Sequence, residues 1–135
     1  MPRIPNKPIP DEDRVFRNIH PTWIQRNGRI ATGAFYDSRT PSKLSVFWEE
    51  YCKKPSFARN LMHEPSIYGV YSLLTQRVRQ NINFDVLHCP SKYSETDFPE
   101  ITALKNAHSL ITGSDEETAW MLRDIAEEEV PVPQK

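Results

Sequence analysis

Apolar and polar residues alternate in several short stretches of the chain, and this period of two predicts β-strands. The first such stretch ends at His20, because the residue before Pro21 is held in extended geometry. The expected strands outnumber the expected helices, which favours an α+β fold with a mainly antiparallel sheet. The expected strands cover residues 15–19, 43–48, 67–74, 83–87 and 107–112.

Turn and helix signals separate these strands. The dipeptide Asn27-Gly28 lies between the segments 22–25 and 29–35 and predicts a β-hairpin, because both residues accept a positive φ. Ser56 is expected to begin a short helix that ends near residue 63, before Pro65.

The clearest helix signal lies near the C-terminus. Ser114 followed by Glu117 has the form of a capping box, in which each side chain satisfies a free backbone N–H of the first turn. The helix is expected to extend to about Glu128, with an apolar stripe facing the sheet. This stripe consists of Ala119, Leu122, Ile125 and Ala126.

Trp120 lies on the opposite side of this predicted helix, next to the acidic residues Glu116 and Asp124. A tryptophan among carboxylates is either covered by another part of the chain or serves as an anchor for a partner protein. Trp48 and Tyr51, in another aromatic-rich segment, are further candidates for such a surface. Both explanations of Trp120 remain open from the sequence.

The 135 residues suit one domain of α+β class, a mainly antiparallel sheet with a C-terminal helix packed on one face. Twelve prolines are about twice the average share, and several of them gather at the two ends. Because proline lacks an N–H and holds φ fixed, we expect residues 1–13 and 130–135 to be extended tails. The folded domain is then expected to cover residues 14–129.

Charge and hydropathy limit the partners and the cellular location that we expect for the protein. The 17 basic and 18 acidic residues are well mixed, so no overall field favours nucleic acid or an anionic membrane. No apolar run approaches the 18 residues of a transmembrane helix, and the N-terminus lacks the apolar core of a secretory signal. A cytoplasmic protein with reduced Cys52 and Cys89 is expected.

Metal and cysteine chemistry find little support. The histidines and cysteines lack the spacing of zinc sites, so we expect no metal and no cofactor. Cys52 precedes Lys53 and Lys54, which would favour a reactive thiolate, but a small buried side chain is the preferred interpretation. A Gly-x-Ser-x-Gly nucleophile motif is also missing.

One polar group of residues does indicate chemistry. Arg17 lies inside the first expected strand and His20 at its end, while Ser45 and His108 belong to later strands. An arginine, a hydroxyl and a late histidine in a split antiparallel sheet resemble the ADP-ribosyltransferases and RES-type toxins, which implies binding of NAD. In that interpretation Arg17, His20 and His108 would be catalytic. The alternative is an Arg17 paired with a carboxylate and a His108 that is part of the core.

The chain also resembles a set of short bacterial cytosolic proteins, to which we attach no activity. The matching pieces cover most of the folded region, and the resemblance implies a small bacterial domain that accompanies larger partners. The pieces are residues 17–21, Gly28-Arg29, Ala34-Phe35, 44–46 and 107–113.

The sequence therefore supports three hypotheses. The preferred one is an interaction or accessory subunit of a bacterial multi-protein system, which binds a protein partner through Trp120 and its neighbours. The alternative is a NAD-consuming enzyme. Nucleic-acid binding is disfavoured by the balanced charge, although four arginines are candidates for it. These are Arg26, Arg29, Arg77 and Arg79.

Overall fold

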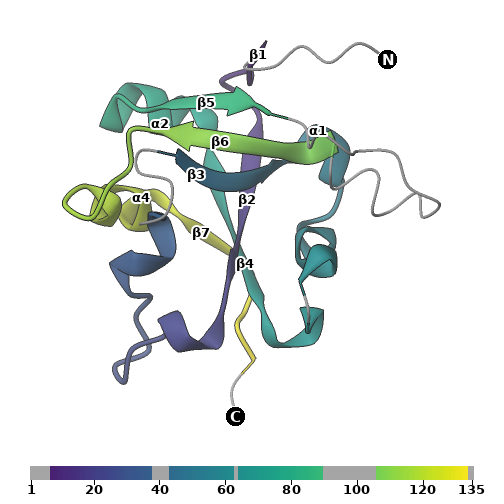
Figure 1. The fold of residues 1–135 in the computed structure, drawn as a ribbon, viewed down its shortest axis with the longest axis vertical. Coiled ribbons are helices and arrows are strands. Elements are labelled where there is room, and N and C mark those ends of the chain that lie inside the picture. Colours follow the sequence, from purple (N-terminus) through teal and green to yellow (C-terminus); the bar gives the residue numbers. More distant parts are fainter. Residues whose placement is uncertain (1–6, 38–42, 63, 90–105, 134–135) are drawn as a thin grey trace.

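The computed structural model describes residues 7–37, 43–62, 64–89 and 106–133. They form the expected α+β fold, in which every strand pair of a seven-stranded sheet is antiparallel. The strand order is β1-β5-β6-β3-β2-β4-β7 (Figure 1). The strands are β1 (Lys7–Pro8), β2 (Arg14–Ile19), β3 (Lys43–Trp48), β4 (Gly69–Leu74), β5 (Asp85–His88), β6 (His108–Thr112) and β7 (Glu127–Val130).

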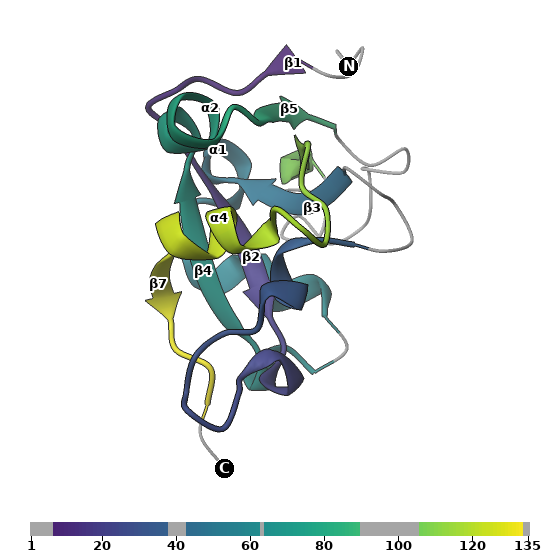
Figure 2. The same ribbon diagram turned by 90° about the vertical axis from the view of Figure 1, so that its left-hand side faces the viewer.

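Short helices lie between the strands and cover both faces of the sheet. On one face the 3-10 helix η2 and the helices α2 and α4 contribute to the larger core; α1 and η3 enclose a smaller core on the other face (Figures 1 and 2). The α-helices are α1 (Glu49–Cys52), α2 (Thr75–Ile82) and α4 (Ala119–Ile125). The 3-10 helices are η1 (Pro21–Trp23), η2 (Thr32–Phe35), η3 (Pro55–Leu61) and η4 (Pro65–Ile67).

The alternation along β2 determines which core each side chain enters. Val15 and Ile19 are fully buried in the larger core, whereas Phe16 belongs to the smaller one. Successive residues of a strand point to opposite faces, so a strand between two helical layers buries both of its faces. The strands predicted at 15–19 and 43–48 are confirmed nearly residue for residue.

The C-terminal helix is present but shorter than the capping box predicted, since α4 covers Ala119–Ile125 only. The Ser114 side chain is buried and donates to the Phe35 carbonyl, so it does not cap the helix. Asp115 closes the preceding turn instead, because its Oδ1 accepts from the backbone N–H of Glu117 and of Thr118, each at 3.0 Å. The predicted apolar stripe is confirmed: Ala119 and Leu122 are fully buried.

The glutamates after α4 form a strand, and the prediction that they continue the helix is wrong. β7 pairs with the outer edge of β4, where Tyr71 lies opposite Glu128. The Tyr71 hydroxyl donates to Glu128 Oε2 at 3.1 Å, and Ser72 Oγ donates to Glu129 Oε1 at 3.2 Å. The edge of β4 thus supplies hydrogen-bonding partners for both the backbone and the side chains of these glutamates. At the end of a helix their negative charges would instead face the negative end of the helix dipole.

The predicted hairpin around Asn27-Gly28 is reduced to one isolated bridge between Ile24 and Ile30. Gly28 does adopt the positive φ that the dipeptide favours, at 83°. The flanking residues form η1 and η2, because His20 caps the first of these and the second buries Phe35 in the core. The short helix expected from Ser56 is a 3-10 helix.

Helix α2 was not predicted. It occupies the short segment between two expected strands, and both Thr75 and Val78 are fully buried. It ends at Asn83, whose left-handed conformation, with φ 65°, lets its N–H bond back to the helix.

The expected tails are wrong at their inner ends. Ile9 is fully buried, and β1 pairs with β5 through Lys7 and His88. At the other end Val130 pairs with Val70, and Val132 packs on the larger core. Proline is tolerated at sheet edges because an edge strand needs only part of its hydrogen bonds, so proline content alone did not mark these segments as unfolded.

Candidate functional site

The strongest candidate site is a cleft at the point where β2 separates from β3. Pairing between these strands is recorded at Val15 and Phe16 only, whereas β2 remains paired with β4 as far as Ile19. β2 and β4 therefore continue past β3 as a separate ribbon (Figure 1). The cavity beside the free edge of β2 measures about 740 Å³, and we call it the β2–β3 cleft.

Arg17 is the principal cation of the cleft. Its Nε donates to the Ala34 carbonyl at 2.8 Å and its Nη1 to the Ser45 carbonyl at 3.1 Å. Its guanidinium lies over the Trp23 ring, 5.3 Å from the centroid. Both of these hydrogen-bonded partners are neutral backbone carbonyls.

Burial lowers the pKa of Arg17 to about 10, and the negative charge of Asp37 partly offsets this effect. The guanidinium therefore remains charged at neutral pH. Asp37 also lines the β2–β3 cleft, so side chains of both signs of charge face the cavity. A ligand that carries both signs of charge would complement this arrangement.

Ser45 and His108, which lie in different strands, are in contact. Ser45 lines the cavity, and its Oγ lies 3.2 Å from His108 Nε2. The other ring nitrogen, Nδ1, lies 2.7 Å from the Cys89 carbonyl. Phe47 packs edge-on against the imidazole, with 6.3 Å between the ring centroids. His108 is half-buried and hydrogen-bonded at both nitrogens.

His20 also lines the cleft, where it has a structural task as well. Its Nδ1 accepts the Thr22 N–H at 3.1 Å and thereby caps η1. Because Nδ1 is an acceptor, the neutral ring carries its proton on Nε2. The ring meets Tyr68 edge-on, with 5.2 Å between centroids.

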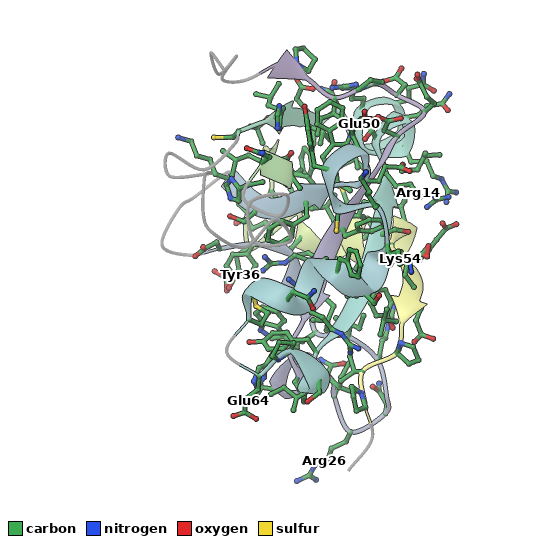
Figure 3. The ribbon with its side chains drawn as sticks, turned by 90° about the vertical axis from the view of Figure 1, so that its right-hand side faces the viewer. Arg14, Arg26, Tyr36, Glu50, Lys54 and Glu64 are labelled. Carbon is green, nitrogen blue, oxygen red and sulfur yellow. The ribbon has the colours of Figure 1, made fainter. Side chains whose placement is uncertain are left out.

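Sequence reasoning missed the aromatic walls of the cleft. Trp23, Tyr36 and Tyr68 reach it from the 3-10 helices or from residues next to them. Figure 3 shows Tyr36 on the side of the molecule at mid-height, well away from Arg26 at one end. No periodic pattern in the sequence marks such residues, because each comes from a different short segment. Asn18 is a further missed residue; it donates to the Ala58 carbonyl at 2.8 Å.

The partner-binding residues predicted from the sequence do not form one surface. Trp120 is 45% exposed on α4, and Glu116 and Asp124 are exposed as well. Trp48, by contrast, is only 6% exposed and donates through Nε1 to Asp13 Oδ2 at 2.8 Å. Tyr51 is half-buried and stacks on His88. Trp48 and Tyr51 therefore belong to the packed interior around β3, because the alternation of that strand turns Trp48 inward.

The arginines considered for nucleic-acid binding are partly engaged by acidic residues. Arg79 forms ion pairs with Asp11 at 2.8 Å and with Asp85 at 2.9 Å. Arg29 lies 3.8 Å from Asp124. These contacts reduce the positive potential that phosphate binding would need.

We expect Cys52 to be almost inert toward iodoacetamide at pH 8 in the folded protein. Its thiol is buried, and burial raises its pKa to about 12, so very little thiolate is present. Cys89 is half-buried and is expected to react faster. Peptide mass spectrometry after timed labelling measures both rates, with the protein in denaturant as the control. Labelling of Cys52 at the denatured rate would contradict the assignment as a core residue.

Within the described part of the chain, no group of three or more acidic, histidine or cysteine side chains is placed to hold a metal ion. Among the same residues, no helix has the length and apolar character needed to cross a bilayer. Comparison with known proteins found no matching family model, curated protein or solved structure. The function is therefore inferred from the residues of the cleft.

Proposed function

We propose that the protein is an enzyme that binds NAD in the β2–β3 cleft and breaks the bond between nicotinamide and ribose. The observation that carries this proposal is Arg17, a charged guanidinium held at the cleft by two carbonyls and the Trp23 ring. This is the enzyme hypothesis of the sequence analysis.

The charges of NAD agree with those of the cleft. Its pyrophosphate is an anion that a guanidinium binds through charge-assisted hydrogen bonds. Its nicotinamide ring is a cation, and Asp37 provides a negative charge in the same cavity. The aromatic rings of Trp23, Tyr36 and Tyr68 offer stacking surfaces for the two bases. ATP carries the phosphates but lacks the cationic ring, so NAD fits the pair of charges better.

The proposal is tested with the purified full chain and NAD. Isothermal titration calorimetry measures binding, and chromatography measures the release of free nicotinamide over time. We expect saturable binding of NAD, weaker binding of ATP, and nicotinamide release that depends on the enzyme concentration. Failure to bind NAD at millimolar concentration, or equal binding of ATP, would overturn the proposal.

A second candidate function is binding of a protein partner through α4, in a cytoplasmic bacterial assembly. The specific observation in its favour is Trp120, the only large hydrophobic side chain exposed among the described residues. Glu116 and Asp124 flank it, so a partner with an apolar pocket and a basic rim would complement this surface.

We expect Trp120→Ala to leave the free energy of unfolding within about 0.5 kcal/mol of the wild type, because the side chain projects from a surface helix. Loss of an anchor tryptophan should weaken a complex by about 2 kcal/mol or more. Urea unfolding measures the first value, and affinity capture followed by mass identification, with wild type and variant side by side, measures the second. A partner retained equally by both proteins would remove Trp120 from the interface.

A further inference from the structure

We infer that Ser45 and His108 form a nucleophile and base pair, and that Ser45 Oγ attacks the ribose carbon that bears nicotinamide. This inference rests on the proposed function for its substrate and adds the reacting groups. The contact between the His108 imidazole and the hydroxyl of Ser45, which lines the cavity, carries it.

The hydrogen bonds of His108 determine its tautomer. A carbonyl oxygen only accepts, so the 2.7 Å contact with the Cys89 carbonyl places a proton on Nδ1. The neutral ring therefore presents a lone pair on Nε2. Ser45 Oγ, 3.2 Å away, is the donor to that lone pair. This is the arrangement in which a histidine, oriented by a third group, removes the proton of a serine nucleophile.

The sheet register keeps the pair together. Ser45 lies opposite Leu110, and Phe47 lies opposite His108, so Ser45 and His108 are diagonal neighbours on the same face of β3 and β6. The Arg17 guanidinium also holds the Ser45 carbonyl, at 3.1 Å. The nucleophile is thus connected to the group that we expect to bind the pyrophosphate. These contacts place the serine hydroxyl beside the proposed ligand without a nucleophile motif in the sequence.

The proposed chemistry has two steps. First, Ser45 Oγ bonds to the ribose carbon while the bond to nicotinamide breaks. The electron pair of the broken bond stays on nicotinamide, which leaves as a neutral molecule. The Ser45 proton moves to His108 Nε2. Water then attacks the same carbon, Ser45 Oγ leaves and recovers its proton from His108, and the proton of water passes to solvent. The products are nicotinamide, ADP-ribose and one proton.

The test compares wild type with Ser45→Ala and His108→Gln in the nicotinamide-release assay. A general base contributes about 100-fold or more to a rate, so each variant should lose at least about that factor. The double variant should be no slower than the slower single one, because the two groups act as a unit. Rapid quenching followed by intact and peptide mass spectrometry should detect ADP-ribose on Ser45 in the wild type.

Control variants distinguish the role of the Ser45–His108 pair from the proposed cleavage of NAD itself. Ser66→Ala changes an exposed serine on η4 and should leave the rate unchanged. Ser45→Cys keeps a nucleophile in place and guards against a folding defect of the alanine variant; it should retain more activity than Ser45→Ala. If NAD is cleaved but Ser45→Ala is as fast as wild type, the pair is refuted and the proposed function stands. If NAD neither binds nor reacts, both are refuted.

Discussion

Replacement of Arg17 by alanine is expected to weaken NAD binding by at least about 100-fold. That factor corresponds to about 2.7 kcal/mol, the value of one or two hydrogen bonds between a charged donor and a phosphate. The loss should appear as a higher Kd in isothermal titration calorimetry. It follows from the position of Arg17, whose charged guanidinium lines the β2–β3 cleft.

Two further variants make this prediction specific. Arg17→Lys keeps the positive charge but not the planar fork, so it should recover only part of the affinity. Arg26→Ala removes an exposed arginine at one end of the molecule, well away from Tyr36 (Figure 3), and Arg26 does not line the cleft, so this variant should bind as the wild type does. Equal losses for Arg17→Ala and Arg26→Ala would show that only net charge matters. A folded Arg17→Ala that binds normally would remove Arg17 from the site.

Phe35→Ala is expected to lower the free energy of unfolding by about 3–5 kcal/mol, as loss of a fully buried aromatic ring usually does. Phe35 is 0% exposed in the larger core, and η2 packs against α4. The backbone of the same short helix also holds the cleft, because the neighbouring Ala34 carbonyl accepts from Arg17. Urea or guanidinium titration followed by circular dichroism measures the change.

Phe35→Leu is the matched variant, because it keeps an apolar side chain and leaves a smaller cavity. We expect it to cost less than half as much as Phe35→Ala. Its NAD affinity should stay close to that of wild type if the η2 backbone keeps its place. Equal destabilisation by leucine and alanine would contradict the assignment of Phe35 to a closely packed core.

The cleft exists because two strands that pair at one end separate at the other. β2 follows β3 at Val15 and Phe16 and then stays with β4, which leaves the β3 side of Arg17 open to the cavity. The helices η1 and η2 then close the cavity with Trp23 and Tyr36. Burial of a charged group among neutral carbonyls and rings costs free energy unless a ligand or the fold compensates the charge. Buried charged groups of this kind are concentrated at binding sites.

Part of this site could be predicted from the sequence. Arg17, Ser45 and His108 lie in strands whose alternation is easy to recognise, so their faces and their convergence were open to inference. Trp23, Tyr36 and Tyr68 were not, because they belong to irregular segments whose positions depend on how η1, η2 and η4 pack. Trp48 was misjudged, since its place in an aromatic-rich segment does not reveal that the strand turns it inward.

The sequence by itself determined the α+β class, the alternating strands β2 and β3, and the helix α4 with Ala119 and Leu122 inside and Trp120 outside. These features depend on local periodicity, which a short stretch of chain contains in full. The tertiary structure decided the rest. It turned Glu127–Val130 into an edge strand, because β4 offered open hydrogen-bonding groups that no local pattern records. It also brought together Ser45 and His108, which are 63 residues apart in the sequence, through the register of β3 and β6.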